Sequence, residues 1–269
     1  MGRIPAISRA SPDLPAAPRG GISPDPMAAA SAGDLHTALE RQGFAVLDAV
    51  LPADLIAPLL AECARLEHSH ARTTRAGLRD ALTRLPESRA VAGHPHLWQI
   101  VESLLGPSVF ITRAILFDKS PRSNWMVAWH QDLTIAVARR RDVAGFGPWS
   151  IKDGIPHVQP PIDVLAAMLS VRVHLDDCGI DAGPLEVLPG SHCGQRWDRA
   201  AIESWRQCVA PVPCCTGQGG VVLMRPLLLH ASARARRAVP RRVLHLECAA
   251  RNLPFGLEWH RRWSPADDA

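Results

Sequence analysis

Residues 227–249 read LLLHASARARRAVPRRVLHLECA, two apolar stretches that flank a basic loop. Each stretch is short and apolar, which is typical of a buried β-strand, and the arginines and the proline between them mark a connection. The predicted strands are Leu227–Ser232 and Arg242–Ala249. His230 lies near the end of the first, and Arg241 stands eleven residues later at the start of the second. The segment therefore predicts a β-rich second half in which strands fix two polar side chains.

The same pattern extends through the chain from residue 108, where short apolar stretches alternate with Pro and Gly. The further predicted strands are Val109–Phe117, Met126–Asp132, Ala166–Leu175, Leu185–Leu188 and Gly220–Met224. Before residue 108 the apolar spacing is mostly helical. It predicts helices Leu35–Gln42 with Asp34 as N-cap, Ala53–Glu67 and His96–Leu105, and one strand, Phe44–Leu47. Helices followed by many short strands predict a mainly β domain with flanking helices, built as a sandwich or barrel.

The domain organisation predicted is a single folded domain, residues 33–269, after a disordered leader, residues 1–32, rich in Pro, Ala, Ser and Gly. Met27 is an alternative start to Met1. An insertion, residues 133–164, has no strong periodicity, and we expect a lid or a disordered loop. Its Phe146 and Trp149 either close over a bound substrate or dock the insertion onto the sheet, and the sequence favours neither.

Composition excludes several classes of protein. The net charge is only +4, and the lysines number two, so a nucleic-acid partner is not expected. No apolar run reaches the 18 residues of a membrane span, and no signal-peptide core is present. The seven cysteines form no Cys-x-x-Cys pair, which argues against a zinc ribbon and favours a reducing, cytoplasmic location.

A candidate metal site lies in AWHQDLTIAV, residues 128–137. On a strand, His130 and Asp132 would point to the same face and Gln131 to the other. Imidazole and carboxylate together suit non-haem Fe(II), completed by a second histidine. The pair alone is weak evidence, because any half-buried strand can show it by chance. His230 offers the third ligand.

A candidate cosubstrate site accompanies the metal site. Arg241 can hold a carboxylate through a bidentate pair, and Ser232, on the face of His230, can add a hydroxyl donor. A dicarboxylate that chelates iron at one end and binds Arg241 at the other describes 2-oxoglutarate.

The chain resembles the phytanoyl-CoA dioxygenase family of Fe(II)/2-oxoglutarate oxygenases. The resemblance depends on WHQD at 129–132, GPLEVLPGSH at 183–192, HAS at 230–232 and the arginine eleven residues after His230, and it extends from about Phe44 to Leu257. It implies a double-stranded β-helix, a jelly-roll with helices on one side. It also implies His130, Asp132 and His230 as iron ligands, and Arg241 and Ser232 as 2-oxoglutarate contacts.

The expected activity is a dioxygenase reaction that uses Fe(II), 2-oxoglutarate and O2, releases succinate and CO2, and hydroxylates an unactivated C–H bond of a small molecule. Halogenases of this family replace the ligand carboxylate by a small residue, so the presence of Asp132 favours hydroxylation. The alternatives are a non-catalytic jelly-roll that binds a metal or ligand, and a cupin-type metalloenzyme without a cosubstrate. The cupin alternative gives no reason for Arg241. The substrate and the oligomeric state stay open.

Other polar residues have competing interpretations. Arg172 and His174 share one face of a predicted strand. If that face looks into the barrel, Arg172 could line the cosubstrate or substrate pocket; otherwise the face is a solvated row of polar residues. His245 and Glu247 are expected to form a buried pair, and His192 to brace a loop by a hydrogen bond. The possible substrate contacts are Arg172, Phe146 and Trp149. Arg79 and Arg84 precede the sheet and could approach the cosubstrate, which the sequence does not decide.

Overall fold

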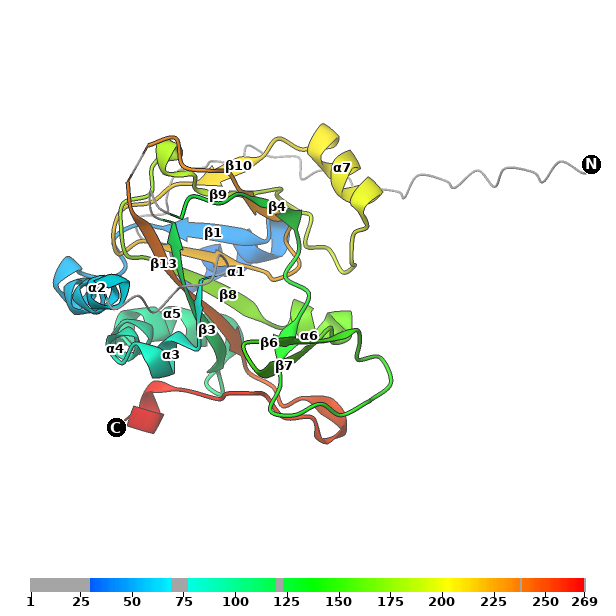
Figure 1. Cartoon of the computed structure of the whole chain (residues 1–269). Coiled ribbons are helices and arrows are strands. Elements are labelled where there is room, and N and C mark those ends of the chain that lie inside the picture. Colours follow the sequence, from blue (N-terminus) through cyan, green and yellow to red (C-terminus); the bar gives the residue numbers. More distant parts are fainter. Residues whose placement is uncertain (1–29, 69–76, 120–122, 238, 269) are drawn as a thin grey trace, which may run out of the picture.

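The computed structural model describes residues 30–68, 77–119, 123–237 and 239–268 (Figure 1). Most of the predicted leader, residues 1–29, lies outside the described residues. The first helix begins at Ala32 rather than after Asp34, because Ser31 is its N-cap. The Ser31 hydroxyl accepts a hydrogen bond from the backbone N–H of Asp34, and the Asp34 carboxylate accepts one from the N–H of Ser31, so the two form a capping box.

Two antiparallel sheets form the core of the domain. The large sheet has the strand order β1-β11-β8-β13-β3-β2, and the small sheet has the order β10-β9-β12-β4. The strands of the large sheet are β1 (Phe44–Leu47), β2 (Leu78–Arg79), β3 (Phe110–Lys119), β8 (Leu169–His174), β11 (Val221–Met224) and β13 (Arg241–Ala249). The strands of the small sheet are β4 (Val127–His130), β9 (Leu185–Val187), β10 (Val212–Cys214) and β12 (His230–Ser232).

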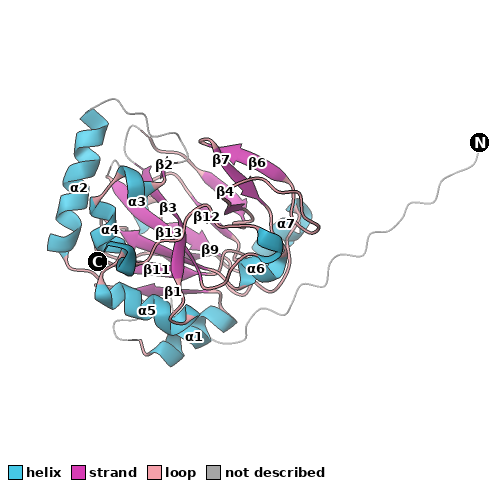
Figure 2. Cartoon of the chain, turned by 90° about the horizontal axis from the view of Figure 1, so that it is seen from below, coloured by secondary structure: helices cyan, strands magenta, loops and turns pink. Residues whose placement is uncertain are grey.

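Helices cover the outer face of the large sheet (Figure 2). Apolar side chains from several of them, such as Leu39 and Leu59, pack with Val171 and Leu244 of that sheet in the largest hydrophobic cluster. These helices are α1 (Ala32–Arg41), α2 (Ala53–His68), α3 (Ala81–Arg84), α4 (Glu87–Ala92) and α5 (Pro95–Leu105). Helices α6 (Ile162–Ala166) and α7 (Arg199–Cys208) pack in other hydrophobic clusters. Three short 3-10 helices, Ile180–Ala182, Pro254–Gly256 and Pro265–Asp268, complete the elements.

The inner faces of the two sheets share a second cluster. Phe44 and Met224 of the large sheet pack there with Val187 and Cys214 of the small sheet. Two antiparallel sheets facing each other around a core, with helices on one side, make the double-stranded β-helix, or jelly-roll, that the resemblance implies. All the predicted strands are present, with ends that differ by a few residues.

The insertion, residues 133–164, is a small sheet of its own rather than a disordered loop. Its strands are β5 (Ile135–Ala136), β6 (Trp149–Lys152) and β7 (Ile155–Val158), in the order β5-β7-β6. Phe146 is only 7% exposed and packs in a third hydrophobic cluster, against which Trp149 also packs. The cluster includes Trp259, near the C-terminus, so the insertion is anchored to the rest of the domain. The docking interpretation of Phe146 therefore holds.

Two features bear on the cellular setting. All seven cysteines are free thiols. Among the described helices, none combines the length and the apolar composition that crossing a bilayer requires.

Candidate metal centre and active-site cavity

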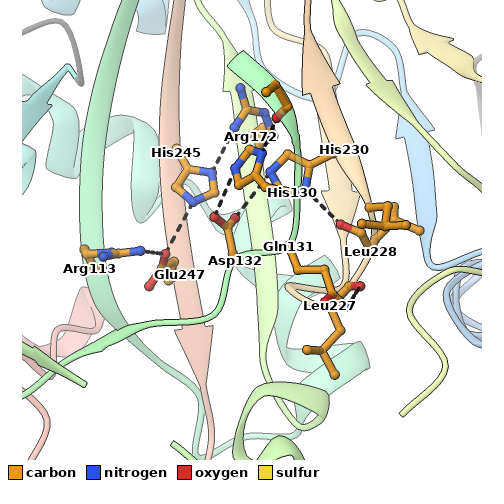
Figure 3. A network of polar contacts seen from close by, with 12 residues as sticks. Arg113, His130, Gln131, Asp132, Arg172, Leu227, Leu228, His230, His245 and Glu247 are labelled. Carbon is orange, nitrogen blue, oxygen red and sulfur yellow. Dashed lines mark hydrogen bonds and ion pairs between the residues drawn. The ribbon is translucent and has the colours of Figure 1, made fainter. Parts of the chain in front are cut away.

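Two neighbouring strands of the small sheet bring the candidate ligands together. His130 ends β4 and His230 begins β12, and the antiparallel register places the two residues directly opposite each other. Their rings lie 4.2 Å apart between centroids. The Asp132 carboxylate lies 3.8 Å from Nε2 of His130 and 3.7 Å from Nε2 of His230 (Figure 3). One ligand atom from each of these three residues lies within 4.8 Å of the others.

The expected reason for the pairing of His130 and Asp132 was wrong in part. β4 ends at His130, so Asp132 is not on the strand and the two-residue period does not orient it. Instead, the backbone N–H of Asp132 donates to the carbonyl of Pro226, just before β12, at 2.9 Å. A tertiary hydrogen bond therefore brings the carboxylate to the histidines.

Hydrogen bonds fix the orientation of both imidazoles. Nδ1 of His130 lies 2.8 Å from the carbonyl of Ala128, and Nδ1 of His230 lies 2.8 Å from the carbonyl of Leu228. A carbonyl can only accept, so each Nδ1 carries the proton and each Nε2 presents a lone pair. Both lone pairs face the carboxylate of Asp132. All three groups can only accept hydrogen bonds, so a cation bound between them would satisfy all three.

The charge states suit a divalent metal. Burial lowers the pKa of His230 to about 4, so this imidazole is neutral near pH 7. Burial opposes ionisation of Asp132, but electrostatic interactions with the nearby His230, His245, His130 and Arg113 hold its pKa below the ordinary value. Two neutral nitrogens and one carboxylate, held on one side, are the donor set of a non-haem Fe(II) site. The residues present therefore fit the metal that the resemblance implies.

Gln131, between the two ligands, turns away from them (Figure 3). Its amide nitrogen donates to the carbonyls of Leu227 at 2.7 Å and Gln195 at 2.9 Å, and its amide oxygen accepts from the N–H of Trp197 at 2.8 Å. The prediction that it faces the other way is confirmed. Gln131 ties the ligand segment to two other loops.

A polar chain runs along the inner face of β13 beside the metal site (Figure 3). Glu247 is 3% exposed, pairs with Arg113 of β3, and lies 3.6 Å from Nε2 of His245. Nδ1 of His245 lies 3.3 Å from Nη1 of Arg172, which can only donate, so Nδ1 accepts and Nε2 carries the proton toward Glu247. The buried His245–Glu247 pair is confirmed, with Arg113 as a partner that the sequence did not suggest.

The other end of β13 carries cations that have no carboxylate partner among the described residues. Arg241 is 3% exposed, and its Nη2 donates to the Ser232 hydroxyl at 3.4 Å. Its Nε and Nη1 have no hydrogen-bond partner among the described residues. The Cys178 thiol beside it is only a weak acceptor. Lys119 lies opposite Arg241 on β3, and its Nζ donates to the same hydroxyl at 2.8 Å.

We call Lys119, Arg241 and Ser232 the cationic end. Burial, and then the charge of Arg241, lower the pKa of Lys119 to about 7. The Ser232 hydroxyl donates its proton to the carbonyl of Gly183 at 3.0 Å, so it orients both cations as an acceptor. Unpartnered buried guanidinium nitrogens fit the distal carboxylate of 2-oxoglutarate. Lys119 was not predicted as a site residue, although it is one of two lysines and lies two residues after the predicted strand Val109–Phe117.

Gly183, in the motif GPLEVLPGSH, allows the close approach that this end needs. Its φ is +65°, and a Cβ atom there would lie 2.6 Å from the carbonyl oxygen of Ala233. That carbonyl also accepts a hydrogen bond from Lys119 at 2.5 Å. A side chain at position 183 would therefore displace the segment that holds Lys119.

A cavity of about 510 Å³ joins these groups. Arg172 lines it and is buried, so this strand face does look into the barrel. Arg79 also lines it, whereas Phe146 and Trp149 lie elsewhere, in the cluster that anchors the insertion. His192 hydrogen-bonds to the carbonyl of Glu40 at 3.2 Å, as expected for a residue that braces a loop.

The chain is similar to several known proteins. Residues 39–243 match the family model described as phytanoyl-CoA dioxygenase. Ectoine dioxygenase of Bordetella bronchiseptica is 26% identical over 179 residues, which cover 61% of this chain and 50% of that protein. The chain thus spans about half the length of this curated relative.

Solved structures share the fold. EctD from S. alaskensis, with 2-oxoglutarate and 5-hydroxyectoine, superposes with a TM-score of 0.62 at 22% identity, covering 91% of this chain and 86% of that one. The non-haem α-ketoglutarate-dependent carbocyclase SnoK from nogalamycin biosynthesis has a TM-score of 0.62 at 18% identity, covering 83% and 86%.

Proposed function

Because the chain belongs to the phytanoyl-CoA dioxygenase family of Fe(II)- and 2-oxoglutarate-dependent oxygenases, we propose that it oxidises a small-molecule substrate with O2. The observation that carries the proposal is one cavity that joins three convergent ligand atoms to a buried arginine without a carboxylate partner. A barrel wall that only supported the fold would not need both the three convergent ligand atoms and the buried arginine.

The roles of the residues follow from their contacts. His130, Asp132 and His230 would hold Fe(II) through Nε2, a carboxylate oxygen and Nε2. When bound, iron and 2-oxoglutarate supply the chemistry that reduces O2, releases succinate and CO2, and oxidises the substrate. Arg241 and Lys119 bind the distal carboxylate of the cosubstrate, and the Ser232 hydroxyl orients both cations. Arg172 adds positive charge to the same end.

The finer activity that we propose is hydroxylation of an unactivated C–H bond. Its support is Asp132, which keeps a carboxylate where family halogenases have a small residue. The SnoK carbocyclase shows that this fold also serves ring closure, so the product must be identified directly. The rival, a non-catalytic jelly-roll that binds a ligand, is separated by succinate release that depends on both 2-oxoglutarate and O2.

The insertion, residues 133–164, would act as the wall that closes the cavity in a single oxygenase domain, residues 33–269. Lys152 of β6 reaches the cavity, and Phe146 anchors the insertion in the core. A cytoplasmic location is proposed from the seven free thiols, which suit a reducing compartment.

The test is an anaerobic titration with Fe(II) and 2-oxoglutarate, followed by the weak visible charge-transfer band. We expect the band in the wild type and its loss in Asp132→Ala. Asp142→Ala, which removes an exposed carboxylate nearby, is the matched control and should keep the band. A wild type without the band, or Asp132→Ala with it, would rule out the proposed metal site.

A further inference from the structure

Lys152 is a half-buried cation that the insertion brings to the cavity. It lies at the end of β6, and its Nζ donates to the neutral hydroxyl of Thr134 at 3.0 Å. Lys152 makes no ion pair among the described residues, and it lines the cavity together with Arg79 and Arg113. Nothing in the proposed roles of iron and cosubstrate uses it.

The charges near Lys152 leave one positive charge uncompensated. Arg79 pairs with Asp153 at 2.9 Å, and Arg113 pairs with Glu247. Each of these arginines therefore has its own carboxylate. Asp132 belongs to the metal site. Among the described residues that line this side of the cavity, Lys152 is the cation without a carboxylate partner.

This positive charge is separate from the cationic end. Arg113 lies opposite Glu247 on β13, whereas Lys119 lies opposite Arg241, six residues away along the same strand. Six residues of strand span roughly 20 Å. The groups that act on Lys152 are Arg113, Arg79, Glu247 and Asp132, and none belongs to the cationic end. One dicarboxylate at the metal and Arg241 would leave Lys152 without an anion.

The empty cavity is an unfavourable place for this ammonium. Burial lowers the pKa of Lys152, and the charges of Arg113 and Arg79 lower it further. A ligand anion would offset both effects, which is the usual reason for a cation held without a partner at a binding site.

Along β3, the cavity wall between Arg113 and Lys119 is formed by the apolar side chains of Ile115 and Phe117, with Arg172 over the Phe117 ring. Met126 is 65% exposed, so the apolar surface continues to the mouth of the cavity. A ligand that fills this space needs an apolar body and one charged group.

We propose that the substrate is an apolar carboxylic acid whose carboxylate binds Lys152 on the insertion side of the cavity, with its apolar body against Ile115 and Phe117. This inference rests on the proposed function. A monoanion matches the single uncompensated charge, and a phosphate monoester with nearly two charges would exceed it. Arg79, already held by Asp153, shapes the site.

The test compares two probes of similar shape, 4-fluorobenzoate and 4-fluorobenzamide, by 19F relaxation. The full-length protein carries Mn(II) in place of iron and a saturating concentration of 2-oxoglutarate, so paramagnetic relaxation reports a probe beside the metal. We expect the wild type to bind the benzoate about tenfold more tightly than the benzamide, from one charge-assisted hydrogen bond. Lys152→Gln should reduce this preference to less than about twofold, and Lys152→Arg should retain most of it.

The controls separate this inference from the proposed function. Arg139→Gln removes an exposed positive charge from the same insertion and should keep the preference. Lys152→Gln should still bind Mn(II) and 2-oxoglutarate as the wild type does. If the wild type binds neither, the proposed function fails, and saturation-transfer NMR without metal still compares the two probes. Equal binding of the probes, no binding of either, displacement of benzoate by excess 2-oxoglutarate, or a preference that survives Lys152→Gln would each overturn the inference.

Discussion

The two ends of β13 hold buried charges in opposite ways. At the C-terminal end, Glu247 lies between Arg113 and His245, so each charge has a partner. At the N-terminal end, Arg241 lies opposite Lys119, and no carboxylate is paired with either among the described residues. The first end is complete without a ligand, and the second is complete only with one. The paired charges around Glu247 thus belong to the wall of this barrel, whereas the unpaired charges of Arg241 and Lys119 mark where an anion binds.

The largest effect should follow from breaking the compensated end. Glu247→Gln leaves Arg113 buried without its carboxylate, and we expect a loss of about 3 kcal/mol in the free energy of unfolding, measured with urea. Arg241→Met removes a cation that has no carboxylate partner among the described residues, so the stability of the ligand-free protein should not fall. Equal losses in both variants would mean that Arg241 is a structural residue.

The stabilisation that a ligand provides should depend on the opposite end of β13, at Arg241. In the presence of Mn(II), 2-oxoglutarate at a hundred times its dissociation constant should stabilise the wild type by about 2.7 kcal/mol. Glu247→Gln should keep this increment, and Arg241→Met should lose most of it at the same concentration. An increment that persists in Arg241→Met would place the distal carboxylate elsewhere.

The pH dependence of cosubstrate binding should come from Lys119. Its pKa in the ligand-free protein is lowered to about 7, and only the protonated form attracts a carboxylate. The dissociation constant of 2-oxoglutarate should therefore rise above pH 7, by up to about tenfold per pH unit, or about 1.4 kcal/mol. Calorimetry from pH 6 to 9 with Mn(II) measures this slope. Lys119→Met should bind more weakly at pH 6 and show a flatter slope, and an unchanged slope would contradict the assignment.

The smallest effect concerns Arg172, which lies between the two ends. It contacts His245 at 3.3 Å, and its charge also acts on Lys119. Arg172→Met should weaken 2-oxoglutarate binding about fivefold, or about 1 kcal/mol, less than Arg241→Met does. An effect equal to that of Arg241→Met would mean that Arg172 also binds the cosubstrate. No effect would mean that Arg172 only supports the wall of the barrel.

The sequence predicts the elements that have strong local patterns. β1 is present as predicted, Phe44–Leu47, because four apolar residues follow a helix that ends before Gly43. The spacing of His230 and Arg241 also predicts one side of the candidate site, because both residues sit on strands whose apolar neighbours fix the register.

Features that depend on distant contacts were not predictable. The insertion forms a sheet because Phe146 and its neighbours find a hydrophobic cluster that includes Trp259, and no local periodicity reports this. Lys119 gains its significance only from the register that sets it opposite Arg241. Asp132 reaches the histidines through a hydrogen bond to Pro226, not through a strand.

The way Asp132 is held has an evolutionary consequence. Its backbone is fixed by the carbonyl of Pro226, and Gln131 beside it is fixed by three hydrogen bonds, so the backbone of this segment does not depend on the carboxylate. A mutation to a small residue would remove one proposed metal ligand and leave both histidines and the cavity in place. The scaffold thus lies one substitution from an open coordination position for a halide, and selection could explore that change of chemistry without rebuilding the protein.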